Sequence, residues 1–567
     1  MAVIRRTTKA LFFTTSPRTP MKMRPEIELL INNLAGQPWN IDTQTAYADL
    51  LSASPDYEGS AYTDFSARDR INRSPQGLGF VDLKPVIALT DAGREFINSR
   101  RPHEIFTRQL MKFQIPSAYH VENRNDVGRF YVRPYLELLR MLYDLDGLSK
   151  DEIAIFFMQL TRVDLYDTVR QKIMDFRTSV ENLDRSQTSY NRYFAEISDN
   201  EMREIYQETI AERNFHIRES RGRSSSLDKF IRTKRRNLMD YADAAIRYMR
   251  TTQLVTVTAR SNRAIIAPDR LQDVEFLLRT IERNPMDFET VADFKNYLFD
   301  SRNIELLSDD FDMLMANIRE FEPSISDQQL ANLDIEELKD LLDDLRENRL
   351  FVRLEEEREI IETYGEHDSI QEIYREILER ESIDPPLMLE WNTWRAMVML
   401  DDGTINGNFL LDYEGMPLNT APGNMPDIIC EYADFDLLVE VTLQTGQRQY
   451  ESEGEPVSRH LGAHRRESEK EAYCLFIAPR ISPGTLAHFF LLHRVNISYY
   501  QGTSSIIPMN LDDYQELLRK ANENDVKPTS EDIRGFLRQL SQMALECENE
   551  QIWFEQISTM AQNGLNG

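Results

Sequence analysis

The chain has 567 residues, enough for about two to four domains, and its 41% apolar content is that of a globular protein rather than a disordered one. Three cysteines without a Cys-x-x-Cys pair exclude a disulfide framework and a cysteine zinc site, so a reducing cytoplasm is expected. No apolar run approaches the length of a membrane span, and the first residues hold no signal-peptide core, so we expect no membrane partner.

The net charge of −29 is divided unevenly along the chain. Residues 1–270 hold 41 Lys and Arg against 35 Asp and Glu, a net of +6, whereas residues 271–567 hold 25 against 60, a net of −35. Such asymmetry indicates regions with different partners. The N-terminal half suits a polyanion such as nucleic acid, whereas the C-terminal half would repel one unless a metal ion neutralises it.

A basic arm opens the chain. It holds six Lys and Arg and no acid before Glu26. Such an arm either follows the phosphates of a nucleic acid, with Arg18 among the contacts, or is a solvated terminus. Helices are expected next, over Pro25–Leu34 and Thr43–Ser52.

A basic helix follows over Phe65–Arg73, with a short strand pair and a capped helix behind it, up to Ile97. This order is typical of a winged helix, in which the helix before the wing enters the major groove of DNA. Arginine suits both guanine edges and phosphates, so three arginines of this segment are candidate DNA contacts: Arg68, Arg70 and Arg73. The alternative is that they form ion pairs with Asp64 and Asp69.

Arg100 and Arg101 begin a connector and are further candidate DNA contacts. Three helices are predicted beyond it, the last one capped by Gly147–Ser149: Ile105–Phe113, Tyr131–Leu145 and Lys150–Leu160. The connector therefore joins the first winged-helix-like unit to a largely helical second one.

The strongest basic signal lies between Arg213 and Arg250, where eleven basic residues stand against four acids and apolar residues recur at helical spacing. Segments rich in β-branched residues follow at Leu254–Ala259 and Ala264–Ala267, which makes a second helix-plus-wing unit. A membrane-surface helix is the alternative, but the wing favours DNA. The candidate phosphate contacts are Arg232, Lys234, Arg235 and Arg236.

Residues 271–380 hold 31 acids against 12 bases and repeat an apolar helical spacing, so they are expected to form an acidic helical linker. Its acids are interpreted as a solvated face. A DNA-mimicking face that holds a nuclease closed is the alternative.

A mixed α/β core is predicted after Pro386. Met388–Leu400 has helical apolar spacing and carries Glu390 at its start, where it would either hold a metal-bound water or pair with the helix dipole. Strands and helices then surround a hairpin. The expected strands are Ala472–Ile477, Ile497–Tyr500 and Ile506–Pro508, and the expected helices are Thr485–Leu492, Leu511–Ala521, Ser530–Glu546 and Gln551–Gln562.

The hairpin turns at Ala433-Asp434 and places two carboxylates opposite one another. Strand alternation puts an apolar set on one face, and the other face carries Asp427 opposite Glu440. Cross-strand Cβ atoms lie roughly 4.5–5.5 Å apart, so these like charges need a cation or a shared proton. Mg²⁺ fits, because it takes one or two carboxylates and leaves positions for water and phosphate. The alternative is an ordinary hairpin with acids on its solvated face.

Pro426-Asp427, then twelve residues, then Glu440-Val441-Thr442 is similar to the PD-(D/E)xK nuclease motif, with Thr442 in place of the lysine. Further motifs accompany it in both halves of the chain: Ser16-Pro17-Arg18, Phe65–Arg70, Arg100-Arg101-Pro102, Glu390–Trp394, Gly423–Asp427, Glu455–His460 and Tyr473–Pro479. Together they resemble, over nearly the full length, the AlwI-type family of type IIS restriction endonucleases, which includes site-specific nicking enzymes. That family has Glu-Val-Thr at the second carboxylate, so Thr442 is no departure from it.

The resemblance implies an active site made of Glu390, Asp427, Glu440, Val441 (through its carbonyl), Glu453 and His460. Asp427, Glu440 and Val441 would hold Mg²⁺, for which Mn²⁺ substitutes; Glu453 would orient water, and His460 would orient water or touch phosphate. His460 and His464 also have zinc spacing, but the Glu of a His-Glu-x-x-His site is missing. No Gly-x-x-x-x-Gly-Lys-Ser/Thr loop occurs, so no use of ATP is expected.

The predicted fold is multidomain α+β. A winged-helix-like DNA-recognition domain is expected over residues 1–275, in two subdomains of about 1–110 and 111–275. An acidic helical linker over 276–384 and a mixed α/β, restriction-endonuclease-like cleavage domain over 385–567 complete it.

The predicted function is that of a prokaryotic, cytoplasmic type IIS restriction endonuclease. It would bind a short asymmetric site in double-stranded DNA and hydrolyse phosphodiester bonds a few base pairs outside it with Mg²⁺, beside a cognate DNA methyltransferase. The alternatives are a nicking enzyme, or a large subunit that needs a small nuclease subunit or a transient homodimer. From other classes, a non-catalytic DNA-binding regulator and a two-carboxylate glycosidase remain.

Overall fold

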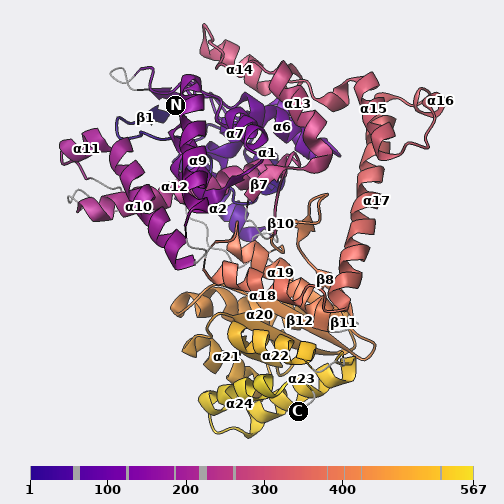
Figure 1. Ribbon diagram of the computed structural model, residues 1–567. Helices are drawn as coiled ribbons and strands as arrows, with labels where there is room; N and C mark the ends of the chain where they lie inside the picture. The colour runs from indigo at the N-terminus through magenta and orange to yellow at the C-terminus, as the bar shows by residue number, and fades with distance from the viewer. Residues whose placement is uncertain are drawn as a thin grey trace. The chain divides into compact units, whose positions relative to one another are not determined.

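The computed structural model describes residues 2–54, 64–122, 127–183, 187–215, 226–259, 263–379, 381–400, 403–422, 424–523 and 527–565. They form a multidomain, mixed α+β protein in which helices predominate (Figure 1). Contacts divide the chain into two compact units: unit 1, formed by Met1–Ser52 and Ala61–Leu345, and unit 2, formed mainly by Arg346–Gly567. None of the described helices is both long and apolar enough to cross a membrane.

The first part of unit 1 follows the predicted order of helix, strand pair and capped helix. The Thr90 hydroxyl caps the last helix by accepting a hydrogen bond from the backbone N–H of Gly93 at 2.9 Å. The elements are β1 (Ala2–Ile4), α1 (Met23–Leu34), α2 (Ile41–Ala53), α3 (Asp64–Asn72), α4 (Ser74–Gly77), β2 (Val81–Asp82), β3 (Ala88–Leu89), α5 (Asp91–Asn98) and α6 (Pro102–Lys112).

The second part of unit 1 surrounds the long basic helix α12, and β5, β7 and β6 form an antiparallel sheet. Ser149 starts α8 with a complete capping box, in which Glu152 is the second partner. The elements are β4 (His120–Glu122), α7 (Pro134–Asp144), β5 (Leu148–Ser149), α8 (Lys150–Ile155), α9 (Tyr166–Glu181), α10 (Gln187–Ile205), α11 (Gln207–Ala211), α12 (Leu227–Thr251), β6 (Val255–Val257) and β7 (Arg263–Ile266).

Two predicted helices of this part are shorter than expected. Helix α7 begins at Pro134 rather than Tyr131, because proline occupies the first helical turn while Tyr131 and Val132 make isolated β-bridges. Helix α8 ends at Ile155, and the chain continues as a 3-10 turn over Phe157–Gln159 instead of an α-helix to Leu160.

The acidic segment is helical, and its part before Arg346 belongs to unit 1. Gln109 of α6 donates to the carbonyl of Leu298 at 2.6 Å, and Lys295 pairs with Asp82 at 2.6 Å. Residues 271–345 hold 20 acids against 6 bases, a net of −14, whereas residues 1–52 and 61–270 of the same unit hold 41 bases against 33 acids, a net of +8. Unit 1 as a whole is therefore net negative. The helices are α13 (Leu271–Thr280), α14 (Val291–Phe299), α15 (Phe311–Phe321), α16 (Asp327–Leu330) and α17 (Ile335–Glu362).

Unit 2 is built on a five-stranded sheet in the order β14-β13-β12-β11-β8. Strands β12, β13 and β14 run parallel, whereas β11 pairs antiparallel with both β12 and β8. The elements are α18 (His367–Leu378), α19 (Pro385–Leu400), β8 (Thr404–Gly407), β9 (Leu410–Leu411), β10 (Pro417–Asn419), β11 (Ile428–Glu431), β12 (Phe435–Val441), α20 (Gln447–Glu467), β13 (Glu471–Ala478), α21 (Pro483–Arg494), β14 (Ile506–Asn510), α22 (Leu511–Glu523), α23 (Ser530–Glu546) and α24 (Glu550–Asn563).

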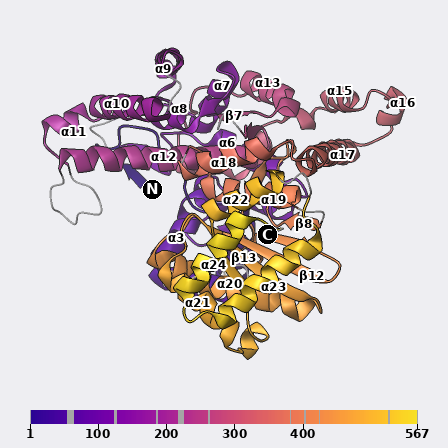
Figure 2. The same ribbon diagram turned by 60° about the horizontal axis from the view of Figure 1, so that its bottom comes forward.

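Helices cover both faces of this sheet. On one face Val457 of α20 and Phe489 of α21 pack on Leu438 and Phe476 in a buried cluster. On the other, α19 and α22 meet, where the Tyr514 hydroxyl contacts the Met397 sulfur at 3.2 Å. Figure 2 shows the yellow C-terminal helices α22, α23 and α24 gathered against the sheet. Because β12 is buried on both sides, five of its seven residues are apolar, and its two acids, Asp436 and Glu440, are buried with them.

The strand predicted over Ile497–Tyr500 is wrong. The chain folds into a 3-10 turn over Ser498–Tyr500, closed by paired 3.1 Å backbone hydrogen bonds between Ile497 and Gly502. Gln501 has a φ of 62°, which turns the backbone out of an extended path. Of the apolar and aromatic side chains that suggested a strand, Ile497 and Tyr500 pack instead against the buried cluster formed with α20 and α21, and Tyr499 is exposed.

A matched pair of Gly→Ala changes should separate close packing from helix propensity in unit 2. In α20 a Cβ on Gly462 would lie 2.9 Å from the Tyr500 Cα, so Gly462→Ala must displace backbone and should cost about 1–3 kcal/mol of stability. In α23 a Cβ on Gly535 meets nothing within 4 Å, so Gly535→Ala should stabilise by roughly 0.5–1 kcal/mol.

Urea unfolding followed by tryptophan fluorescence measures both effects, because Trp391, Trp394 and Trp553 all lie in unit 2. Equal midpoint shifts for the two variants would contradict the close approach of α20 to Tyr500.

Candidate active site

The predicted hairpin is confirmed in its register. Ile428 pairs with Val439 and Cys430 with Leu437, so Asp427, just before β11, comes next to Glu440 of β12. The Asp427 Oδ2 accepts a hydrogen bond from the backbone N–H of Val441 at 2.8 Å. Gly423, the first residue of the Gly423–Asp427 motif, lies outside the described residues. The two carboxylates are therefore neighbours at the end of the strand pair.

Helix α20 covers the face of the hairpin that carries the acids. The Glu440 Oε1 lies 2.7 Å from His460 Nδ1, and the Asp436 Oδ2 lies 2.9 Å from His464 Nε2. Strand alternation on β12 and the helical repeat of α20 put each histidine over a different carboxylate. The two histidines therefore do not converge on one zinc position, and the acids do not lie on a solvated face, since Glu440 is only 6% exposed.

Glu390 joins the group from α19. Its Oε2 accepts a hydrogen bond from the backbone N–H of Ala421 at 3.0 Å, and its side chain is buried. The helix begins at Pro385 and has no acid in its first turn, so pairing of Glu390 with the helix dipole is excluded.

Glu453 is held by the residue that stands in the lysine position of the motif. The Thr442 hydroxyl donates to the Glu453 Oε1 at 2.9 Å, which links the end of β12 to α20. Glu455, the other acid beside Gly454, is exposed and contacts Arg459 at 3.4 Å. The structure therefore gathers Glu390, Asp427, Glu440, Glu453 and His460 in one place.

Burial perturbs all four carboxylates in the same direction. It raises the pKa of Glu390 to about 10, with the charge of Asp427 as the next cause. Burial, and then the charge of Glu440, holds the pKa of Asp427 well above its usual range. The pKa values of Glu440 and Glu453 are likewise raised, first by burial. Ionising such a group requires a compensating cation.

The donor set fits a hard divalent cation, because it consists of carboxylate oxygens that repel one another when no cation is bound. Within the described part of the chain, no three His, Cys, Asp or Glu side chains already stand as a closed metal cluster. The fit therefore rests on the crowding of Asp427, Glu440 and Glu390 and on the direction of their pKa shifts.

One cation of this site, Arg459, is not among the site residues predicted from the sequence. Its Nη1 donates to the Asn424 Oδ1 at 3.0 Å, and its charge favours the ionised form of Glu440 against burial. Its position beside His460 in a quoted motif was the available signal, but the spacing alone does not show that α20 turns it toward the acids.

The three arginines of the first predicted winged helix form ion pairs in the DNA-free chain. Arg73 and Arg68 contact Asp69 at 2.7 and 3.2 Å, so the pairing alternative is confirmed for that acid. Arg70 Nε donates at 2.9 Å to Glu26, which is fully buried. Arg68 and Arg73 keep 35% and 41% of their side chains exposed, whereas Arg70 keeps 18%.

The remaining candidates fall into two groups. Arg101 is buried and contacts Glu336, Asp340 and Asp343 of α17, and Arg100 lies 3.8 Å from Asp340. Arg18, Arg232 and Arg236 are exposed, Arg235 lies 3.6 Å from Asp199, and Lys234 lies over aromatic rings. The segment directly after the first basic helix contacts the second, since the hydroxyls of Ser74 in α4 and Tyr248 in α12 lie 2.5 Å apart.

Comparisons with known proteins give one family match and several similar solved structures. The family model of the AlwI restriction endonuclease matches residues 76–517. No curated protein gives a significant match. Among solved structures, the small subunit of the heterodimeric restriction endonuclease R.BspD6I is 25% identical, with 35% of this chain and 98% of that chain covered and a TM-score of 0.30.

Two further solved structures are similar. The BpuJ1 endonuclease binding domain, in complex with modified DNA, is 13% identical over 52% of this chain and 96% of its own, with a TM-score of 0.32. Restriction endonuclease FokI is 11% identical over 86% of this chain and 85% of its own, with a TM-score of 0.23.

The metal-free protein should lose stability as the pH rises. The folded state keeps protons on Glu390, Asp427 and Glu440 that the unfolded chain has released, so the unfolded state binds fewer protons and the free energy of unfolding falls with pH. The window opens at 3.8 to 4.5, the ordinary values for Asp and Glu, and for Glu390 it extends to about 10. Urea unfolding in EDTA across this range measures the slope.

Asp427→Asn should flatten that slope, and Mg²⁺ should restore stability at high pH to the parent chain but not to this variant. Glu431→Gln is the matched control, because Glu431 lies on the same hairpin and is exposed. An unchanged slope in Asp427→Asn would show that the acids are not buried together.

Proposed function

The chain belongs to the AlwI restriction endonuclease family, and from that membership we propose that it is a type IIS enzyme. It binds a short asymmetric site in double-stranded DNA and hydrolyses phosphodiester bonds a few base pairs outside it with Mg²⁺. The observation that carries the proposal is the buried group of Asp427, Glu440 and Glu390, whose mutual repulsion a divalent cation relieves.

The chain's own residues hold and orient the reacting groups. The Val441 N–H fixes Asp427, and His460 fixes Glu440, so that both carboxylates and the Val441 carbonyl would hold Mg²⁺. A bound Mg²⁺, or Mn²⁺ in its place, polarises the scissile phosphate and lowers the pKa of water.

Glu453 takes the role of the motif's lysine. Its Oε1 is engaged by Thr442, which leaves Oε2 to accept a hydrogen bond from the attacking water. Burial raises the pKa of Glu453 above its ordinary value, which makes its carboxylate a stronger proton acceptor. Glu390 holds a further water at the site, and Arg459 supplies the positive charge that faces the phosphate.

DNA recognition is assigned to the two helix-plus-wing units of residues 1–275, with residues 276–384 as linker and 385–567 as the cleavage domain. Helix α4, which directly follows α3, meets α12 through Ser74 and Tyr248, and Arg247 of α12 donates to the Arg18 carbonyl of the arm. In this proposal both basic helices and the arm contribute to one DNA-binding surface. Since unit 1 is not net positive, DNA affinity rests on this local concentration of cations.

The exposed or half-buried cations of this surface touch DNA: Arg18, Arg68, Arg73, Arg232, Arg235 and Arg236. Arg70, Arg100 and Arg101 contact acids of the free chain, and DNA contacts by them require these pairs to open. A cytoplasmic location, a cognate methyltransferase and independence from ATP belong to the same proposal. Nicking of one strand, with a homodimer or small nuclease subunit for the second, is its variant.

Removing either member of the acid pair should abolish cleavage and spare DNA binding. Asp427→Asn and Glu440→Gln keep the size of the side chain but remove the charge that would hold the metal, so plasmid cleavage in Mg²⁺ should fall by at least about a thousandfold. Gel-shift affinity in Ca²⁺ should stay within a few-fold. Glu431→Gln should cut at the parental rate. Parental cleavage by Glu440→Gln would refute the site.

The three arginines in and directly after α3 should differ in role: Arg68 and Arg73 should affect DNA recognition, and Arg70 should affect the stability of the fold. Arg68→Met and Arg73→Met should each cost about 1–3 kcal/mol of affinity, and at least one should relax one position of the target, as selection from a randomised DNA pool would reveal. Arg70→Met should instead cost about 3–5 kcal/mol of stability, because it breaks a buried pair with Glu26. If Arg68→Met and Arg73→Met both leave the target preference unchanged, this segment does not take part in base recognition.

A further inference from the structure

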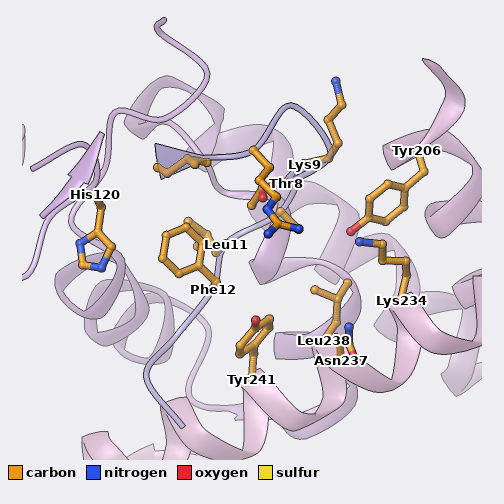
Figure 3. A pocket seen from close by; sticks show the side chains of 13 residues that line it. Thr8, Lys9, Leu11, Phe12, His120, Tyr206, Lys234, Asn237, Leu238 and Tyr241 are labelled. Atoms are coloured by element: carbon orange, nitrogen blue, oxygen red, sulfur yellow. The ribbon is translucent and has the colours of Figure 1, made fainter. Parts of the chain in front are cut away.

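A pocket of about 470 Å³ lies in unit 1 between the N-terminal arm and α12 (Figure 3). Residues Ile4–Phe12 of the arm form one wall, and residues of α12 from Lys234 to Tyr241 form the other. Figure 3 shows His120 and Phe12 on one side of the pocket and Tyr206 and Lys234 on the other. Its volume lies within the roughly 300–1,000 Å³ of small-molecule sites.

The arm is anchored, so this wall is part of the fold. Strand β1 pairs with β4, which brings His120 to the pocket. The Leu11 N–H donates to the Met158 carbonyl at 2.7 Å, and the Arg129 side chain donates to the Thr8 carbonyl at 3.0 Å. The pocket therefore does not depend on a loose terminus.

The pocket is electropositive. Arg5, Lys9 and Lys234 line it, and none of the described lining residues carries a carboxylate. Lys9 is compensated by Glu208 at 2.5 Å, but no described carboxylate pairs with Lys234. Burial, and then the charge of Arg5, lowers the pKa of Lys234. An anion bound beside Lys234 would remove this unfavourable interaction.

The pocket is also aromatic. The Lys234 ammonium lies 5.1 Å from the centre of the Tyr206 ring, which holds the cation in place. The rings of Phe12 and Tyr241 supply flat faces, and the Asn237 amide both donates and accepts hydrogen bonds. Burial lowers the pKa of His120 to about 4, so its imidazole is neutral at physiological pH.

We propose that this pocket binds one nucleotide, with the phosphate at Lys234 and Arg5 and the base against Phe12 and Tyr241. A phosphate and a flat heteroaromatic ring are the two features that its cations and rings recognise together. The inference rests on the proposed function for the source of the ligand, a nucleotide turned out of the bound duplex. A free nucleotide carries the same chemistry, and the test distinguishes the two.

The first experiment uses the full-length protein without DNA or metal. Calorimetric titration with the four deoxynucleoside 5′-monophosphates should show binding that Lys234→Met weakens by about tenfold or more, since a hydrogen bond to a charged group is worth about 1.5–3 kcal/mol. Tyr241→Leu should weaken it through lost stacking. Lys229→Met is the matched control, with the same charge change on an exposed residue of α12 outside the pocket.

The second experiment uses the protein bound in Ca²⁺ to the target duplex, which carries 2-aminopurine at successive positions. A fluorescence rise at one position that Lys234→Met abolishes and Lys229→Met keeps assigns the ligand to DNA. Mononucleotide binding without such a rise assigns it to a free nucleotide.

The proposal is overturned if the parent chain shows neither signal at millimolar nucleotide. It is also overturned if inorganic phosphate binds as tightly as the nucleotides, or if Lys229→Met loses as much as Lys234→Met. Because the mononucleotide titration needs neither DNA nor cleavage, its result stays informative even if the endonuclease proposal fails.

Discussion

Three carboxylates from different parts of unit 2, those of Glu390, Asp427 and Glu440, are buried against one another, and the surrounding structure is arranged to tolerate this. Each ionised carboxylate loses hydration in such a place, and its neighbours add repulsion. The backbone N–H of Val441, the imidazole of His460 and the N–H of Ala421 offset part of that cost and fix the side chains. A divalent cation is the remaining compensation, so the geometry of the acids and the proposed chemistry have the same cause.

Helix α20 is the element on which this arrangement depends most. It supplies His460, Glu453 and Arg459 to the proposed site and Val457 to the buried cluster beside it, so packing of this one helix sets both the geometry of that site and the packing of the core. The close approach of Gly462 to the backbone of Tyr500 sets how near the helix can come.

In unit 1, many of the acids form ion pairs with cations of the same unit. The acids of residues 271–345 contact cations within the same unit: Arg101, Arg108 and Lys339 all pair with them. The balance of +6 over residues 1–270 is therefore not a measure of affinity for DNA, since acids beyond that range belong to the same compact unit. What distinguishes the arm, α3 and α12 is that their cations stay partly exposed or, like Lys234, face a pocket without a described carboxylate.

The amino-acid sequence by itself determined the local features: the hairpin register from strand alternation, the helix starts at Thr90 and Ser149 from capping chemistry, and the helices Ser530–Glu546 and Gln551–Gln562 to within one residue. Periodicity and capping act between near neighbours, so a single sequence displays them. Only the tertiary structure decided that Thr442 holds Glu453, that Arg70 pairs with Glu26, that Arg101 is buried among acids more than two hundred positions away, and that Ile497–Tyr500 turns instead of extending. Those contacts join residues whose separation along the chain carries no periodic signal, and docking of whole helices and strands brings them together.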